Sequence, residues 1–448
     1  MIVPLSSPSS PLRAWLAGQL YSLLLRLATP AYLLRVWSRG RVEPGYRRFW
    51  PQRLGWHSGP AWRPNAQAPV VWLHAVSLGE TRAAVPLVQA LRASLPGMRL
   101  LLTHTTATGR EAGLALMTPA DAQAWLPFDT PGAVRRFLAH FRPDIGVLME
   151  TEVWPNLMRE AAGRGVPMVL ANARLSDKSL RQGERFAALL KPAAAALSLT
   201  LAQTEADAAR LRRMEAEPVE VMGNVKFDMT PPPALLALGR AWREAAGRPI
   251  VLAASTREGE ETLLLAAWRE LIARLPAGEA PQLLIVPRHP QRFDEVAAAI
   301  HAMGWRVSRR STWGAQGVLN DEARSADVWL GDSMGEMPAY YACADIGMLG
   351  GSFAPLGGQN LIEAAACGCP LIVGPSTFNF AEAAEQCLAA GAAWRVGAFD
   401  DACQLASLAL QDGRLPHARE AALTFAATHQ GAASRMAAAI VLCLRQVK

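Results

Sequence analysis

Cysteine is scarce in this sequence: six of 448 residues are cysteine, and none are spaced as a CxxC pair. All lie in the C-terminal half, at Cys343, Cys367, Cys369, Cys387, Cys403 and Cys443. A small set without paired spacing argues against a disulfide-stabilised secreted fold and against a cysteine-bound zinc site. We therefore predict a cytosolic chain with reduced, buried thiols.

Charged residues are also few. They make up 19% of the chain against 51% hydrophobic residues, which excludes a disordered protein and makes the chain more apolar than many soluble enzymes. A length of 448 residues exceeds one compact domain, so we expect two large lobes. The formal net charge of +7 favours an anionic partner without distinguishing nucleic acid, an acidic membrane leaflet and phosphorylated substrates.

Several common site motifs are missing as well. The sequence has no P-loop, no HExxH, no metal-binding DxD, and no GxGxxG after the first predicted strand of either lobe. Each of these motifs marks a particular phosphate, dinucleotide or metal site. Their absence directs attention to less regular loops that are rich in glycine and charge.

An apolar segment runs from Ala14 to Leu34. Its length is close to the ~20 residues that cross a bilayer, but Arg26 and Pro30 interrupt it, so it either spans a membrane or lies in the interface. A soluble helix packed on the first lobe is the alternative. A signal peptide is not indicated, because only Arg13 precedes the apolar run and no A-x-A cleavage pattern follows it.

Arginines and aromatic residues alternate after the apolar segment. The arginines are Arg35, Arg39, Arg41, Arg47, Arg48 and Arg53, and the aromatic residues are Trp37, Tyr46, Phe49, Trp50 and Trp56. Guanidinium groups suit lipid phosphates, and amphipathic rings suit the headgroup layer. We predict that residues 1–45 form a membrane-associated helix and a basic juxtamembrane segment on an anionic cytoplasmic leaflet.

Beyond residue 66, short β-rich runs alternate with helical stretches, which is typical of parallel sheets flanked by helices. The expected strands of the first lobe are Val70–His74, Arg99–Thr103, Ile145–Met149, Pro167–Ala171, Leu199–Ala202 and Val219–Met222. Those of the second are Ile250–Ala254, Gln282–Val286, Arg306–Ser308, Val328–Leu330, Ile346–Leu349 and Pro370–Val373. The proline-rich stretch Met229–Pro233 reads as a linker, which gives lobes at 46–229 and 230–448.

The second lobe contains a glycine-rich cluster, GDSMGEM at Gly331–Met337 and GGSFAPLGGQNLIEAAACGCP from Gly350 to Pro370. Paired glycines allow close backbone approach to a ligand, and a helix beginning near Asn360 would direct N–H groups at a phosphate. Glu363 falls in its first turn, where it either accepts ribose hydroxyls or caps the helix.

Cations follow two strands of the same lobe. Arg288 and His289 end one strand, and Ser255, Thr256 and Arg257 end the other. In wound sheets, ligands collect at the carboxyl ends of strands, so these groups predict an anionic-nucleotide pocket. A solvated arginine and a core histidine are the alternative reading of Arg288 and His289.

The first lobe offers acid–base groups. Glu80, in HAVSLGE, falls in a strand-to-helix turn, where we expect an exposed carboxylate kept ionised by the helix dipole. It is either a general base or an N-terminal capping glutamate. Glu150 and Glu152 follow another strand and Lys226 follows the last, so all four are expected to converge. The hydroxyl-rich stretch Thr103–Gly113 is a weaker candidate for the acceptor side. Loop chemistry alone leaves a nucleotide-sugar transferase and an epimerase open.

A resemblance to a known family becomes specific at these blocks. HAVSLGE, LPFDTPGAVRRFL, METEVWPNL, NARLSDKS, GNVKFD, VPRHPQRF, GDSMGEM, GGSFAPLGGQNLIEAAACGCP and GPSTFNF, in this order, resemble the Kdo transferases of lipopolysaccharide biosynthesis. The match runs from about Trp72 to Glu385. The two enzymatic alternatives above and a non-catalytic membrane scaffold become competing readings.

The resemblance implies a GT-B architecture: an α/β chain with two Rossmann-like wound lobes that face a central cleft. It also implies CMP-Kdo as donor, a tetraacylated glucosamine disaccharide bisphosphate, lipid IVA, as acceptor, and inversion at the anomeric carbon without a metal ion or cofactor. The expected location is the cytoplasmic face of the inner membrane, with anionic lipid and no nucleic acid as partner. The number of Kdo units transferred and the oligomeric state stay open.

Roles for individual residues also come from the resemblance. Glu80 matches the general base that deprotonates the acceptor hydroxyl, and Glu150 and Lys226 match positions that stabilise the transition state. Contacts to CMP are expected from Arg288, His289, Met334, Gly335, Glu336, Asn360, Leu361, Ile362 and Glu363. We further hypothesise that Lys226 pairs with the carboxylate of the sugar.

Overall fold

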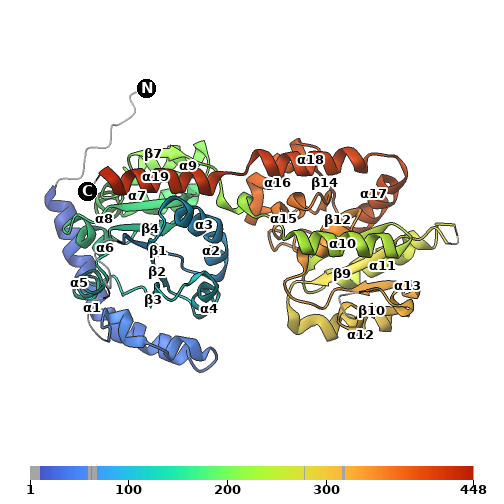
Figure 1. The fold of residues 1–448 in the computed structure, drawn as a ribbon, viewed down its shortest axis with the longest axis horizontal. Coiled ribbons are helices and arrows are strands. Elements are labelled where there is room, and N and C mark those ends of the chain that lie inside the picture. Colours follow the sequence, from blue (N-terminus) through green and yellow to red (C-terminus); the bar gives the residue numbers. More distant parts are fainter. Residues whose placement is uncertain (1–10, 59–61, 63–67, 277, 315–317, 447–448) are drawn as a thin grey trace. The chain divides into compact units, whose positions relative to one another are not determined.

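The computed structural model describes residues 11–58, 62, 68–276, 278–314 and 318–446. The chain forms two compact units (Figure 1). The first contains Met1–Asp228 together with Gln430–Lys448, and the second contains Met229–His429. The chain therefore passes from one unit to the other at two places.

The first lobe is built on a parallel sheet. Among the described residues it has the strand order β3-β2-β1-β4-β5-β6-β7. The strands are β1 (Val70–His74), β2 (Arg99–His104), β3 (Ala122–Trp125), β4 (Ile145–Met149), β5 (Met168–Ala173), β6 (Leu199–Ala202) and β7 (Val219–Val221). Every residue of β1 is buried, as expected for a central strand with both faces covered. In the register of the sheet, Val71 lies beside Leu100 of β2 and Ile145 of β4.

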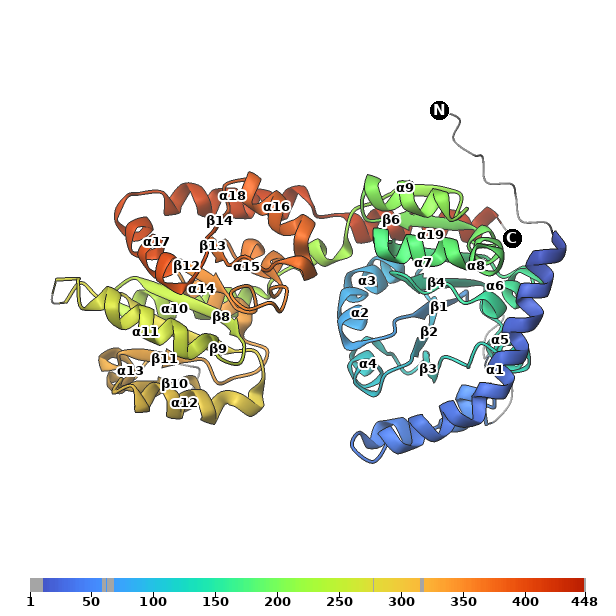
Figure 2. The same ribbon diagram turned by 180° about the vertical axis from the view of Figure 1, so that it is seen from behind.

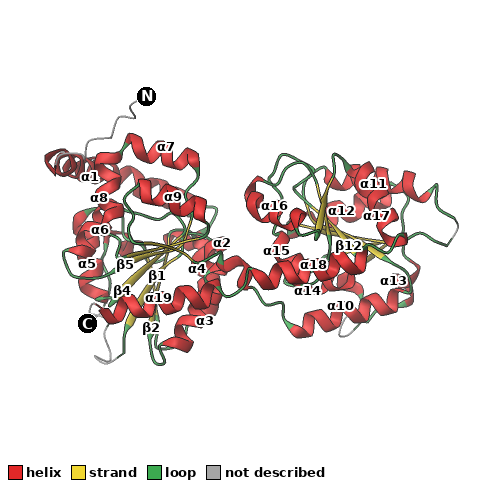
Figure 3. Cartoon of the chain, turned by 90° about the horizontal axis from the view of Figure 1, so that it is seen from above, coloured by secondary structure: helices red, strands yellow, loops and turns green. Residues whose placement is uncertain are grey.

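Helices cover both faces of this sheet (Figure 3). The helices of the lobe are α1 (Pro11–Arg39), α2 (Leu78–Ala83), α3 (Val85–Ser94), α4 (Ala107–Gly113), α5 (Pro131–Phe141), α6 (Pro155–Ala162), α7 (Asp177–Arg185), α8 (Ala187–Ala195), α9 (Glu205–Arg213) and α19 (Ala432–Gln446), with short 3₁₀ turns η1 (Pro44–Arg47), η2 (Trp50–Leu54), η3 (Leu114–Leu116) and η4 (Val225–Asp228). One core cluster joins α2, α3 and α19 to the sheet, and the other joins α5, α6, α8 and α9.

The N-terminal helix α1 packs on the outside of α6 and α8 (Figure 2). Two polar contacts fasten it: the Tyr21 hydroxyl donates to Asp129 at 3.0 Å, and the buried Ser22 hydroxyl donates to Asn156 Oδ1 at 2.9 Å. Large apolar side chains of the helix are nevertheless exposed, at Leu12, Trp15, Leu16, Leu20, Leu23, Leu24, Leu27, Tyr32, Leu34 and Trp37. One side of α1 thus packs on the first lobe, as the alternative interpretation of this segment proposed.

The structure corrects two expectations for this region. None of the described helices is long and apolar enough to cross a membrane, because polar residues such as Gln19, Arg26 and Thr29 lower the hydropathy of α1. Arg53, expected at the lipid surface, is 1% exposed, and Tyr46 is 3% exposed. Both fold inward because their side chains pack around Trp125.

The second lobe repeats the architecture with another parallel sheet. Among the described residues its order is β10-β11-β9-β8-β12-β13-β14. The strands are β8 (Ile250–Thr256), β9 (Gln282–Pro287), β10 (Val307–Arg309), β11 (Val328–Leu330), β12 (Ile346–Leu349), β13 (Leu371–Val373) and β14 (Ala393–Arg395). Its two sheet faces are again apolar, and the buried helices pack there.

The helices of the second lobe are α10 (Pro233–Ala246), α11 (Glu260–Ile272), α12 (Phe293–Ala302), α13 (Asp321–Ser325), α14 (Met337–Cys343), α15 (Leu361–Ala366), α16 (Ala381–Ala389), α17 (Phe399–Gln411) and α18 (Leu415–Thr428), with 3₁₀ turns η5 (Pro290–Arg292), η6 (Arg310–Thr312) and η8 (Phe378–Phe380). A core cluster joins α11, α12 and α17 to one face. On α10, a Cβ at Gly239 would collide with the Ala339 carbonyl of α14, so these two helices pack in close contact.

The domain boundaries differ from the prediction at the C-terminus. The sequence assigned 230–448 to the second lobe, whereas α19 belongs to the first. Met436, Ala437 and Ile440 of α19 are fully buried in the core that includes β1 and α3. The division between lobes falls between Asp228 and Met229, and Pro233 of the expected linker opens α10.

The expected cysteine state is confirmed, since all six cysteines are free and buried. Most predicted strands are confirmed within one or two residues of their ends. Two strands were missed, β3 and β14, each at an edge of its sheet.

Candidate active site

Glu80 lies in the turn between β1 and α2. Its carboxylate accepts hydrogen bonds from Val76 N at 2.8 Å and from the Ser77 hydroxyl at 3.1 Å, while Ser77 caps the helix by accepting from Glu80 N at 3.4 Å. This arrangement is similar to a capping box, except that Glu80 accepts from the N–H of the residue before the N-cap. The capping reading of Glu80 is thus confirmed, and it is compatible with a base because a carboxylate has about four acceptor positions.

The electrostatic state of Glu80 differs from the expectation. The sequence predicted an exposed, ionised carboxylate, but the side chain is half-buried. Burial raises the pKa of Glu80 to about 7, and the negative charges of Glu150 and Glu152 add to the effect. A carboxyl group with a pKa close to neutrality is well matched to proton abstraction at physiological pH.

Glu150 and Lys226 come together from different strand ends. Glu150 follows β4 in the left-handed region with a φ of 59°, and its backbone N donates to Ala171 O at 3.0 Å. Lys226 Nζ lies 3.2 Å from Glu150 Oε1. The predicted convergence is therefore confirmed for these two side chains, and the electrostatic coupling adds Glu80 and Glu152 to the same group.

Glu152 is the third carboxylate of the group. Its Oε2 accepts a hydrogen bond from the indole N–H of Trp154 at 2.8 Å. Burial raises the pKa of Glu152, and the charge of Glu150 raises it further. Three carboxylates with a single paired lysine leave an excess of negative charge, which favours proton uptake at the site.

A small amide network positions Lys226, and sequence analysis missed it. Asn172, which is fully buried, accepts from Val225 N at 3.2 Å, and Asn224 Oδ1 accepts from Lys226 N at 3.0 Å. Asn224 in turn donates to Gln203 Oε1 at 3.0 Å. The signal was the asparagine in NARLSDKS and GNVKFD, a residue that suits turns at strand ends.

The cationic loop of the second lobe is held by backbone and side-chain contacts. Arg288 is exposed, donates from Nε to Gln359 Oε1 at 3.1 Å, and donates from its backbone N to Thr256 O at 3.0 Å. His289 is half-buried and precedes η5. A solvated arginine, which was the alternative interpretation of Arg288, fits this exposed position as well as a phosphate contact does.

Within the predicted cluster Ser255–Arg257, the Thr256 hydroxyl is not available to a ligand. Thr256 is 1% exposed, and its hydroxyl donates to Glu261 Oε1 at 2.7 Å inside the lobe. Glu261 forms a buried ion pair with Arg292 at 2.7 Å. Thr256 thus serves the packing of α11, and the expectation was wrong for this hydroxyl.

A buried carboxylate holds the glycine-rich loop. Glu260 is 2% exposed and accepts from Gly351 N at 2.8 and 2.9 Å, from Phe353 N at 3.3 Å and from Arg257 N at 2.8 Å. Sequence analysis expected these glycines to allow a close approach between the backbone and a ligand. Gly351 N is instead occupied by the protein's own anion, and no local sequence signal joins Glu260 to a loop 91 residues away.

Helix α15 begins where the sequence predicted. Asn360 caps it by accepting from Ile362 N at 3.1 Å, and Glu363 lies half-buried in the first turn. Leu361 and Ile362 are each 1% exposed. Their side chains pack in the core, so only their backbone atoms are available to a nucleotide.

The GDSMGEM block places its residues in different surroundings. Met334 is 63% exposed, and Gly335 has a φ of 81° that favours glycine. Glu336 pairs with Arg310 at 2.8 Å and accepts from the Ser333 hydroxyl. Arg310, which sequence analysis missed, therefore competes with any ligand for this carboxylate.

The sequence of this chain is similar to those of known proteins. Residues 48–229 match the sequence profile of a family described as 3-deoxy-D-manno-octulosonic-acid transferase (kdotransferase). A 3-deoxy-D-manno-octulosonic acid transferase from Bordetella pertussis is 48% identical over 430 residues, which cover 93% of this chain and 96% of that protein. One from Haemophilus influenzae is 36% identical over 368 residues, covering 81% of this chain and 83% of that protein.

Solved structures support the fold. The crystal structure of a glycosyltransferase from Rickettsia africae has a TM-score of 0.54 at 12% identity and covers 85% of this chain and 99% of that chain. At this identity the likeness concerns the fold alone and not the chemistry.

Proposed function

This chain belongs to the 3-deoxy-D-manno-octulosonic acid (Kdo) transferase family of lipopolysaccharide biosynthesis, and from that premise we propose that it transfers Kdo from CMP-Kdo to lipid IVA with inversion at the anomeric carbon. The observation that carries the proposal is the group of Glu80, Glu150, Glu152 and Lys226, in which the pKa of Glu80 is raised to about 7.

In the proposed reaction, Glu80 removes the proton from the attacking hydroxyl of the acceptor. The hydroxyl oxygen forms a bond to the anomeric carbon, the bond from that carbon to the phosphate oxygen breaks, and CMP leaves with the electron pair. A single displacement inverts the configuration. Glu150 and Lys226 stabilise the positive charge that develops on the sugar ring and the charge of its carboxylate.

The second lobe is proposed to bind the cytidylate. Arg288 and His289 end β9, and the Asn360 end of α15 offers backbone N–H groups, so both supply positive potential to the departing phosphate. Met334, Gly335 and Glu336 are proposed to contact the nucleotide, and Leu361, Ile362 and Glu363 to contact it through backbone atoms and the Glu363 carboxylate. The support for Arg288 is its position directly after β9, at the carboxyl end of the strand, where ligands collect in wound sheets.

Membrane association at the cytoplasmic face of the inner membrane is proposed to occur through α1, lying in the interface. The support is its row of exposed leucine and tryptophan side chains, for example Trp15 at 58% and Leu27 at 70%. Such a helix buries its apolar side at the headgroup boundary, with basic residues toward anionic lipid. A lipid acceptor would then be met within the leaflet.

The test incubates the full chain with CMP-Kdo and lipid IVA and follows product mass. The expected product is lipid IVA with added Kdo, together with free CMP. Replacing the donor by UDP-N-acetylglucosamine examines the transferase and epimerase alternatives that loop chemistry left open. Turnover of the UDP-sugar, with no change in lipid IVA mass from CMP-Kdo, would refute the proposal.

A further inference from the structure

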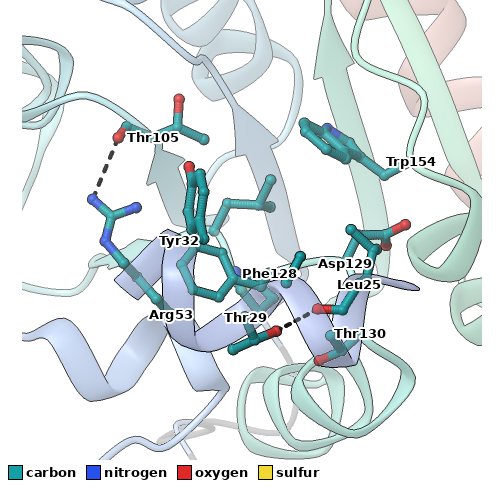
Figure 4. Close-up of a pocket in the computed structure, with 12 residues that line it drawn as sticks. Leu25, Thr29, Tyr32, Arg53, Thr105, Phe128, Asp129, Thr130 and Trp154 are labelled. Carbon is teal, nitrogen blue, oxygen red and sulfur yellow. Dashed lines mark hydrogen bonds between the residues drawn. The ribbon is translucent and has the colours of Figure 1, made fainter. Parts of the chain in front are cut away.

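A pocket opens between α1 and the loop that joins β3 to α5 (Figure 4). Its cavity volume is about 180 Å³. It is lined by Leu25, Ala28, Thr29, Tyr32, Arg53, Thr105, Leu126, Pro127, Phe128, Asp129, Thr130 and Trp154. All of these residues belong to the first lobe.

The polar side chains of Asp129 and Thr29 in the pocket wall are already paired within the protein. Asp129 accepts from Tyr21 at 3.0 Å, from Asn156 N at 2.9 Å and from Leu157 N at 2.7 Å. The Thr29 hydroxyl donates to the carbonyl of the preceding helical turn at 2.7 Å. What remains for a ligand is largely apolar wall, which suits a hydrocarbon chain better than a polar molecule.

Arg53 is the exception. It is 1% exposed, donates from Nη2 to Thr105 O at 3.3 Å, and has a buried Nε without a hydrogen-bond partner. In Figure 4, Arg53 and Trp154 lie on opposite sides of the pocket. An unsatisfied buried cation facing a pocket indicates a ligand that brings oxygen acceptors.

A second arginine lies beside the first. The guanidinium carbons of Arg53 and Arg110 lie 3.9 and 5.1 Å from the centre of the Trp125 ring. Arg110 Nη1 is also buried without a partner. In the described part of the chain, no carboxylate forms an ion pair with either arginine, and burial lowers the pKa of each to about 10. Arg53 is buried and lines the pocket, whereas Arg110 is half-buried and does not line it, so Arg53 is the cation that a ligand in the pocket would meet.

The other end of the pocket adjoins the carboxylates. Trp154 lines the pocket and also donates its indole N–H to Glu152 at 2.8 Å. Glu152 in turn acts electrostatically on Glu80. A molecule anchored in the pocket would therefore have its neighbouring groups close to the general base.

We propose that this pocket receives one acyl chain of the lipid acceptor and that Arg53 binds a phosphate of the same lipid. The inference rests on the proposed function, because it assigns a subsite to that acceptor. Helix α1 forms one wall of the pocket and also carries exposed apolar side chains. If these side chains contact a lipid layer, an acyl chain from that layer lies beside the pocket.

Filling the pocket tests the acyl-chain half. Ala28→Phe adds a ring to the wall, and Ala31→Phe makes the same change on α1 at an exposed position that does not line the pocket. We expect Ala28→Phe to raise KM for lipid IVA about tenfold, since each buried methylene contributes to affinity, with kcat and donor KM unchanged. Equal KM values for the two variants would overturn the inference.

A photoreactive probe locates the chain without relying on turnover. Lipid IVA carrying a diazirine in one acyl chain, in phosphatidylcholine vesicles, should label residues 126–130 in the wild type and in Ala31→Phe but not in Ala28→Phe. Labelling confined to exposed α1 residues would contradict the proposal. So would labelling of residues 126–130 by diazirine-phosphatidylglycerol that lipid IVA does not displace, because a bilayer lipid would then occupy the pocket.

The phosphate half is tested by pairing a variant with a substrate change. Arg53→Gln should raise KM for lipid IVA and leave KM unaltered for an acceptor lacking the phosphate that Arg53 binds, while Arg53→Lys restores part of the loss. An equal rise for both monophosphorylated forms and for lipid IVA would indicate a structural role and refute this half. If the wild type transfers no Kdo at all, the proposed function fails, and crosslinking still reports on the pocket separately.

Discussion

The two lobes share one architecture but prepare their loops in different ways. At the strand ends of the first lobe, Glu80, Glu150 and Glu152 stand close together with Lys226 as a paired cation, so negative charge is in excess. In the second lobe, the buried Glu260 accepts the backbone N–H groups of Gly351 and Phe353 and so holds the glycine-rich loop.

The carboxylates of the two lobes therefore suit different roles, proton transfer in the first lobe and loop support in the second. In the first lobe, burial is the largest cause of the raised pKa of Glu80, and the charges of Glu150 and Glu152 raise it further, which suits proton transfer near neutral pH. Burial raises the pKa of Glu260 as well, so the contrast lies in the larger number of backbone N–H donors that occupy Glu260. A carboxylate surrounded by N–H donors stabilises one loop conformation and is not available for chemistry. A buried carboxylate near a strand end therefore has a different role in each lobe: Glu80 suits proton transfer, and Glu260 supports a loop.

The largest expected effect is that of Glu80→Gln, which removes the base and keeps the shape of the capping turn. We expect kcat to fall by about 10²- to 10⁴-fold. The measurement is the rate of Kdo transfer at pH 8, with Glu205→Gln, an exposed first-turn glutamate of α9, as control. Activity within twofold of the control would remove Glu80 from the mechanism.

The same variant should gain stability at high pH. The pKa of Glu80 is about 7 in the folded chain against an ordinary value of 4.5, so the folded state binds more protons than the unfolded state between these values. The free energy of unfolding therefore falls as pH rises through this window, and Gln avoids the loss. Urea midpoints at pH 5 and 8 check the sign.

Glu260→Gln should act on stability instead. An amide nitrogen cannot accept the backbone N–H groups that one carboxylate oxygen now accepts, so at least one buried donor is left unpaired. We expect a loss of about 2 kcal/mol in the free energy of unfolding of the second lobe. The neighbouring Glu258→Gln, at an exposed side chain, should change it by less than about 0.5 kcal/mol. Equal urea midpoints for the two variants would show that Glu260 does not hold the loop.

Lys226→Met should have an intermediate effect. It removes the cation that lies 3.2 Å from Glu150 and that we propose to pair with the sugar carboxylate. We expect a rise of about tenfold in donor KM or an equal fall in kcat, the size of one charge-assisted hydrogen bond. Steady-state kinetics with CMP-Kdo distinguish these outcomes, and wild-type values for both constants would exclude the role.

Central and edge strands also differ in how well they could be predicted from the sequence. Buried parallel strands such as Val70–His74 were predictable because continuous β-branched and apolar runs fit a covered sheet. The edge strand Ala122–Trp125 was not, because alanine and glutamine have little strand preference and pairing with β2 decides their conformation. The apolar period of α19 indicated a helix but not the lobe that it covers.

For the candidate site, residue types at strand ends were predictable and their environments were not. Glu80 and Lys226 could be selected from position alone, but the raised pKa of Glu80 depends on burial and on two carboxylates from another strand. Arg53 looked like a surface cation until Trp125, 72 residues away in the sequence, enclosed it. Long-range contacts of this kind leave no local pattern.

The smallest expected effect probes the electrostatic contrast most directly. Glu152→Gln removes one of the two charges that raise the pKa of Glu80 and retains an oxygen that can accept from Trp154. Since Glu80 acts only when deprotonated, kcat/KM should decline below about pH 7 in the wild type and at a lower pH in the variant. We expect the shift to be less than about one pH unit, because burial of Glu80 is the larger cause and remains.

Profiles of kcat/KM against pH, measured on the wild type, Glu152→Gln and Glu205→Gln, decide the matter. An unchanged acidic limb in Glu152→Gln would mean that Glu152 does not act on the base. A limb moved to higher pH would mean that Gln has disturbed the turn more than it has relieved the repulsion. Only a move to lower pH, absent from Glu205→Gln, agrees with a Glu152 charge that raises the pKa of Glu80.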